Sequence, residues 1–117
     1  MKTTHAVALL PGDTPGYLLG ELVQTGFFPS ASGDSIDRFY KVTHHCSVTG
    51  DNASFFAAYP AKWAATSCGT NRKYNHPENP PKTEIDKMVM PFGRHRITRY
   101  EKRTLGYEIS DAGISEI

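Results

Sequence analysis

Residues 91–110, PFGRHRITRYEKRTLGYEIS, form the most specialised stretch of the sequence, because basic and aromatic residues alternate along it. Its β-branched and aromatic side chains are typical of strands. The polar residues 101–104 favour a turn between two such strands. We therefore predict a C-terminal β-hairpin over residues 94–110.

Positive charge is concentrated around this stretch. Residues 71–103 carry nine Lys or Arg against four Asp or Glu, although the net charge of the whole chain is only +1. Cationic side chains neutralise phosphates, and tyrosine rings stack on bases. We therefore predict a small non-enzymatic protein, nucleic-acid-binding or regulatory, with DNA or RNA as its partner. The predicted binding residues are Arg94, Arg96, Arg99, Tyr100, Lys102 and Arg103. A second interpretation is that cations on an edge strand only discourage aggregation.

Residues 99–103 and 106–113 also carry a family resemblance. Together they resemble the wing of winged-helix DNA-binding proteins, which often ends in a Tyr-x-hydrophobic-Ser/Thr-x-x-Gly pattern. Residues 18–28 followed by 38–42 are similar to that family's last helix running into its wing. The two stretches compete for the same role, so the resemblance implies DNA binding without assigning a recognition helix.

The rest of the chain predicts an α+β fold. Leu18, Leu19, Leu22 and Val23 share one face of a helix over residues 15–25, and Gly26 can end it. Asn52 or Ser54 can cap a second helix, which carries Phe55, Phe56 and Tyr59 and is followed by another helical turn over residues 62–65. A third helix begins near Pro81, and strands are expected at 7–10 and 36–43. The prediction is three short helices with a small, mainly antiparallel sheet that includes the hairpin, and with Trp63 in the core.

Length and composition predict a single domain over residues 1–117. The 117 residues are 38% hydrophobic and 21% charged, as in soluble globular proteins. Residues 69–81 are rich in Asn and Pro, so we expect a flexible loop there. No apolar run approaches the roughly 20 residues of a membrane span, and the apolar patch near the start is too short for a secretory signal. We expect a cytoplasmic protein with no membrane partner, in which a homodimer could add stability.

Two further hypotheses come from scattered cysteine, histidine and aromatic residues. Cys46 and Cys68 are expected to be reduced thiols in the cytoplasm. The alternative is a zinc site, but the spacing lacks C-x₂-C and H-x₃-H pairs, so we predict no metal, no other cofactor and no catalytic residue. The ligands of such a zinc site would come from His44, His45, Cys46, Cys68 and His76. The other hypothesis is an adaptor or inhibitor that covers a partner protein. Its contact patch would be Phe27, Phe28, Tyr40 and Phe92.

Overall fold

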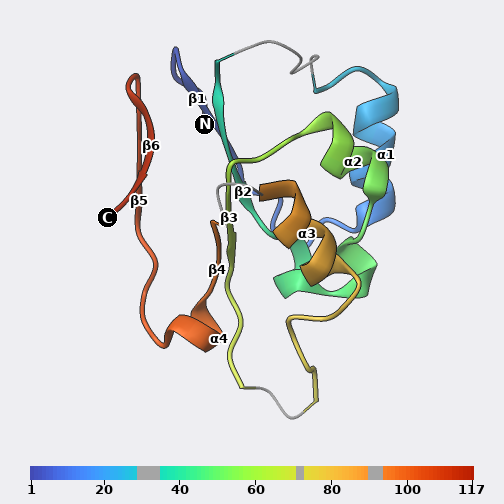
Figure 1. Ribbon diagram of the computed structural model, residues 1–117. Helices are drawn as coiled ribbons and strands as arrows, with labels where there is room; N and C mark the ends of the chain where they lie inside the picture. The colour runs from blue at the N-terminus through green and yellow to red at the C-terminus, as the bar shows by residue number, and fades with distance from the viewer. Residues whose placement is uncertain (29–34, 71–72, 90–93) are drawn as a thin grey trace.

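A parallel sheet lies between three helices on one face and a two-stranded hairpin on the other (Figure 1). The computed structural model describes residues 1–28, 35–70, 73–89 and 94–117. The sheet order is β1-β2-β3-β4, which is the order of the chain. Its strands are β1 (Ala6–Leu9), β2 (Asp37–Lys41), β3 (Trp63–Thr66) and β4 (His95–Ile97). In the register, Ala8 lies beside Phe39, and Ala65 lies beside Arg96.

Helices connect successive strands and cover one face of the sheet. They are α1 (Gly16–Gln24), α2 (Ala53–Ala58) and α3 (Pro81–Val89). The predicted helix over 15–25 is confirmed, and Gly26 follows it with φ +74°. The predicted cap of the second helix is also confirmed, because the Asn52 side chain accepts the Phe55 N–H at 2.9 Å. The third helix begins at Pro81, as expected.

The prediction of a mainly antiparallel sheet is wrong. All three pairings in the four-stranded sheet are parallel. Each strand leads into a helix before the next strand, and such a crossover returns the chain in the same direction. The turn of helix expected over residues 62–65 is instead β3, which is buried along its whole length between the two neighbouring strands.

The predicted hairpin over residues 94–110 is wrong in its boundaries. The first part is β4, which pairs in parallel with β3, and it runs directly into the short helix α4 (Thr98–Glu101). The antiparallel hairpin lies later, between β5 (Tyr107–Ser110) and β6 (Gly113–Glu116). Neither stretch that resembles a winged-helix protein forms a wing next to a recognition helix, since α1 leads into the parallel strand β2.

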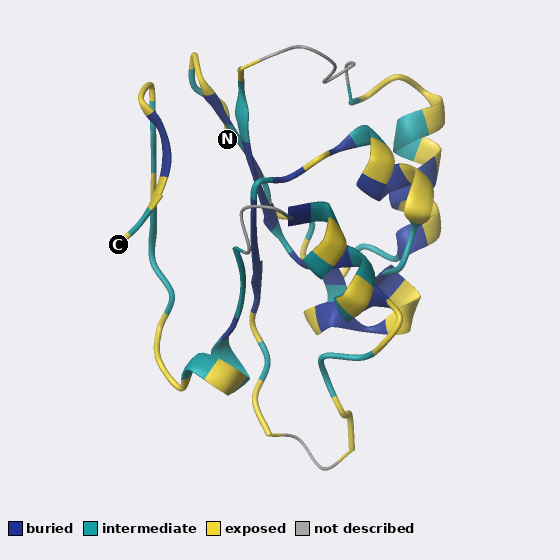
Figure 2. Cartoon of the chain, viewed as in Figure 1, coloured by how far each residue is buried: buried dark blue, intermediate teal, exposed yellow. Residues whose placement is uncertain are grey.

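Both faces of the sheet are covered, and the central strand β3 is dark along its whole length in Figure 2. On the helix face, Leu19, Tyr40 and Phe55 belong to one core. On the hairpin face, Phe39 and Trp63 pack in a second core with Ile114 of β6. Trp63 is only 4% exposed, so its predicted core position is confirmed. This two-sided burial leaves two parts of the sheet that can meet a ligand: the ends of the strands, and a smaller cavity of about 390 Å³ beside β1 that Val7 and Leu9 line.

Candidate functional site

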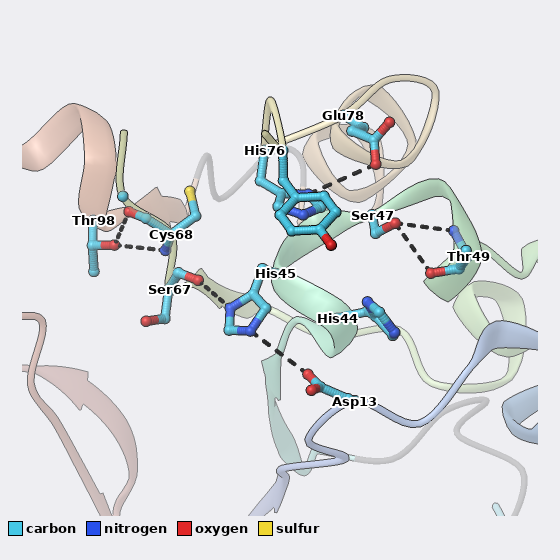
Figure 3. Close-up of a pocket in the computed structure, with 12 residues that line it drawn as sticks. Asp13, His44, His45, Ser47, Thr49, Ser67, Cys68, His76, Glu78 and Thr98 are labelled. Atoms are coloured by element: carbon cyan, nitrogen blue, oxygen red, sulfur yellow. Dashed lines mark hydrogen bonds and ion pairs between the residues drawn. The ribbon is translucent and has the colours of Figure 1, made fainter. Parts of the chain in front are cut away.

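A cleft of about 850 Å³ lies at the carboxyl edge of the parallel sheet. Every strand contributes residues that follow its last position: Asp13 after β1, His45 after β2, Cys68 after β3 and Thr98 after β4. Residues 73–78, which precede α3, supply the opposite wall (Figure 3). Ligands of open α/β sheets bind at this edge because the loops that leave the strands converge there.

A left-handed turn after β2 presents two histidines to this cleft. His44, His45 and Cys46 have φ angles of 52°, 55° and 65°. Each such residue costs about 1–2 kcal/mol relative to the right-handed conformation. Three consecutive strained residues are rare, and strain of this kind is concentrated at functional sites.

Hydrogen bonds to two loops hold the strained turn in place. The buried Thr43 hydroxyl lies 3.0 Å from the Gly12 carbonyl oxygen and 2.5 Å from that of Thr14. The His44 N–H donates to the Gly12 carbonyl at 3.1 Å, and the Glu78 N–H donates to the Cys46 carbonyl at 2.8 Å. The turn is therefore tied both to the loop after β1 and to the segment before α3.

The His45 ring is oriented by a hydrogen bond at Nδ1, and its Nε2 lies near the Asp13 carboxylate (Figure 3). Nδ1 lies 2.7 Å from the Ser67 carbonyl oxygen. Because a carbonyl only accepts, Nδ1 carries a proton. Nε2 lies 3.6 Å from the Asp13 carboxylate, and half of the side chain remains exposed. Since Nδ1 carries the proton of the neutral ring, Nε2 has a lone pair that can accept a hydrogen bond in the cleft.

The facing wall is aromatic. The rings of Tyr74 and His76 are nearly parallel, with centroids 5.8 Å apart and an interplanar angle of 20°. The ring of His45 is 6.2 Å from that of His76. The His76 carbonyl accepts from the Arg99 guanidinium at 2.7 Å, which anchors the segment to α4.

The two cysteines are free thiols, and burial disfavours the thiolate of both. Burial raises the pKa of Cys46 to about 12. The pKa of Cys68 is also raised by burial, although the Arg99 backbone N–H and the positive charges of Arg99 and Lys41 oppose this. Neither thiol is an activated nucleophile at neutral pH.

The residues weighed for zinc do gather partly at the cleft. His44, His45, Cys68 and His76 all line it, whereas Cys46 lies in the core. Within the described ranges, no three His, Cys, Asp or Glu side chains are placed to hold one metal ion. The fold therefore brings His44, His45 and His76 to one cleft, where the rings of His45 and His76 lie near each other and His76 stacks with Tyr74.

A buried polar chain lies on the helix face of the sheet. His95 has a side chain only 2% exposed, with Nδ1 2.7 Å from Asp86 and Nε2 2.8 Å from the Thr66 hydroxyl. Burial lowers the pKa of His95, while the hydrogen bond to Asp86 opposes that shift. Thr66 ends β3 directly before the cleft residues Ser67 and Cys68. The hydrogen bonds from Thr66 to His95 and from His95 to Asp86 therefore hold the end of β3 in place.

The basic residues predicted to bind nucleic acid point to different partners. The Arg94 guanidinium lies over the Trp63 ring, 4.1 Å from its centroid. Arg99 donates to the His76 carbonyl and to the Asn75 side chain. The side chains therefore do not converge on one ribbon.

Arg96 and Arg103 share two acidic partners. Arg96 lies 3.5 Å from Glu101 and 3.3 Å from Glu116, and Arg103 lies 3.0 Å from Glu116 and 3.8 Å from Glu101. This compact arrangement of two cations and two anions offsets its own charge. Tyr100 and Lys102 remain exposed beside it.

The aromatic residues proposed as a protein-binding patch differ in burial and do not form one exposed surface among the described residues. Tyr40 is fully buried, and Phe28 packs against Phe55 in the core, whereas Phe27 is exposed. Phe92 lies outside the described residues. Of the described members of this set, only Phe27 offers a large exposed apolar surface.

Comparison with protein-family models, with curated proteins and with solved structures finds no match. No helix in the described part of the chain is long and apolar enough to cross a bilayer. The case for a function therefore depends on the geometry of the site.

Proposed function

We propose that this protein binds a small polar molecule in the carboxyl-edge cleft and that His45 exchanges a proton with it. The observation that carries the proposal is the strained turn at residues 44–46, which directs His45 into the cleft. Its ring is already oriented by the Ser67 carbonyl, so little reorganisation is needed when a ligand binds.

The dimensions of the cleft support a small ligand. Its volume of about 850 Å³ lies within the range of small-molecule sites, roughly 300–1,000 Å³. Ser47, Ser67 and Gly69 are among the residues that line it, and serine hydroxyls can both donate and accept hydrogen bonds. A molecule of metabolite size can be held by such groups around the imidazole.

Acid–base chemistry is favoured over thiol chemistry. Histidine is the usual proton-transfer group near neutral pH, and the Asp13 carboxylate lies beside this one. Cys68 lines the same cleft, but its raised pKa leaves the thiolate scarce. His45 with Asp13 is therefore the reactive pair in this proposal.

Histidine NMR spectra recorded during a screen of small polar metabolites would test this function. We expect a binding molecule to shift the His45 ring signals and leave those of His5, which lies at the other end of β1, unchanged. His45→Gln should abolish turnover of that molecule while retaining most of the binding. Asp13→Asn should lower turnover less, because only the imidazolium loses its partner. Ligands that all map elsewhere, or turnover that survives His45→Gln, would overturn the proposal.

Nucleic-acid binding by the C-terminal segment is the second candidate. The observation in its favour is that Tyr100, 58% exposed, lies beside the exposed Lys102. Fluorescence anisotropy with duplex DNA and with RNA at low and moderate salt would test it. Weaker binding by the double variant Arg96→Glu, Arg99→Glu would support this function. Binding that is unchanged in the double variant would contradict it.

A further inference from the structure

Three rings make the cleft selective for flat molecules. Tyr74 and His76 form a nearly parallel pair, and His45 faces His76 across 6.2 Å. Tyr74 is half exposed at the cleft, and the Lys73 ammonium lies over its ring, 5.2 Å from the centroid, where an arriving flat ligand would displace it. A flat ring laid on such a wall gains stacking contacts that a sugar or an aliphatic chain cannot make.

The charged side chains of the cleft bear on the charge and the hydrogen-bonding groups of a ligand. Its described lining includes two carboxylates, Asp13 and Glu78, whereas one cation, Lys73, lies over the Tyr74 ring of its wall, so negative charge exceeds positive charge among these residues. Carboxylates accept hydrogen bonds and repel anions. A phosphorylated or carboxylated ligand is disfavoured, whereas a neutral or cationic group with N–H donors is favoured.

We infer that the ligand is a flat nitrogen heterocycle bearing N–H donors, of which an unphosphorylated nucleobase is the simplest example; this inference rests on the proposed function. One ring face lies on the Tyr74–His76 wall, and the N–H edge donates to Asp13 or Glu78. The cleft hydroxyls serve the ring nitrogens and carbonyl groups. The nucleobase can come from a free nucleoside or from single-stranded nucleic acid, and the charge of the cleft favours the nucleoside.

Titration of the full chain with nucleosides, followed by histidine and tyrosine NMR signals, tests this assignment. The probes are guanosine, adenosine and cytidine, with ribose as the ligand without a ring, guanosine 5′-monophosphate as the charged form and a short oligonucleotide as the polymer. We expect a nucleoside to shift the His45, His76 and Tyr74 signals and to bind at least several-fold more tightly than its monophosphate. Ribose should produce no shift.

Matched variants locate the stacking contact. Tyr74→Leu should weaken nucleoside binding about tenfold, as expected for the loss of one aromatic stacking contact, while Tyr74→Phe retains it. Tyr17→Leu, at an exposed tyrosine of α1, should leave the affinity unchanged. Asp13→Asn with Glu78→Gln should reduce the preference for the nucleoside over its monophosphate.

The outcomes separate this inference from the function it rests on. If ribose or another ligand without a ring shifts His45 and the nucleosides do not, the ligand class is wrong and the proposed function stands. An oligonucleotide that binds more tightly than the nucleoside overturns the charge argument. If the whole metabolite screen and all of these probes leave His45 unshifted, the proposed function fails as well.

Discussion

The carboxyl-edge cleft and the C-terminal segment of residues 94–117 both gather charged side chains, but they treat them in opposite ways. In the C-terminal segment, Arg96 and Arg103 are paired with Glu101 and Glu116. In the cleft, the backbone is strained to present His45, which stays half exposed beside Asp13. The difference teaches that local charge density is a weaker indicator of a site than strain that the surrounding structure must support.

Thr43→Val should give the largest effect in this comparison, because Thr43 holds the strained turn. The valine side chain has the same shape but removes the single hydroxyl proton that the partly buried Gly12 and Thr14 carbonyls share. We expect a loss of about 2 kcal/mol in the free energy of unfolding, measured with urea. The His45 ring signals should shift in the same variant.

The control is Thr49→Val, at an exposed hydroxyl on the same cleft. A surface change of this kind should alter stability by no more than about 0.5 kcal/mol. Equal losses in the two variants would mean that the turn does not depend on Thr43.

Acidification should give the next largest effect, through the buried His95. Burial lowers the pKa of the His95 ring in the folded state. Below pH 6.5, His95 of the unfolded chain therefore binds a proton, while His95 of the folded chain stays neutral until its lower pKa is reached. Stability then falls as the pH decreases, by up to about 1.4 kcal/mol per pH unit until the folded pKa is reached. Asp86 and Lys82, which lie nearest on α3, act in opposite directions on that pKa.

Urea unfolding of the native chain and of His95→Gln, at pH 7 and pH 5, isolates this contribution. The native chain should lose more stability between the two pH values than the variant does. His5→Gln is the matched control, because that histidine is exposed. Equal pH dependence in the native chain and His95→Gln would show that the buried ring does not supply it.

The third effect is a gain in stability. His44→Gly should stabilise the fold by about 0.5–1 kcal/mol, since glycine relieves the left-handed backbone but loses more entropy on folding. Lys102→Gly offers the same relief in the C-terminal segment, where Lys102 has φ 53°. Only His44→Gly should also weaken ligand binding in the cleft. Weaker binding in both variants, or in neither, would break the link between strain and function.

The sequence predicted the helices better than the sheet, for a physical reason. The helices at 16–24 and 53–58 are local, and their apolar spacing, the Gly26 terminus and the Asn52 cap are readable from neighbouring residues. Parallel pairing joins strands that are far apart in the sequence. Four residues, Trp63–Thr66, are too few to show a period. Recognising them as a strand would have completed the strand–helix alternation that indicates a parallel sheet.

The same misassignment hid the candidate site. In a parallel sheet the residues after each strand meet at one edge, so Asp13, His45, Cys68 and Thr98 could have been placed together. The left-handed turn itself had no signal in the sequence, because none of its three residues is glycine. Long-range hydrogen bonds to Gly12, Thr14, Ser67 and Glu78 hold that conformation.

Glu116→Gln should cause the smallest loss of stability. The same variant tests whether the C-terminal arginines can bind nucleic acid once an acidic partner is removed. Glu116 is 18% exposed but its two arginines are more exposed, so solvent weakens these ion pairs, and we expect a loss of about 0.5–1 kcal/mol at low salt that decreases at 1 M salt. Because Glu116 offsets the charges of both Arg96 and Arg103, its neutral variant should also expose more net positive charge. Glu108→Gln, at an exposed acid of β5, is the matched control. If Glu116→Gln creates affinity for RNA or DNA that the native chain lacks, the acids exist to suppress polyanion binding; if affinity is already present and unchanged, the pairing argument against this segment is wrong.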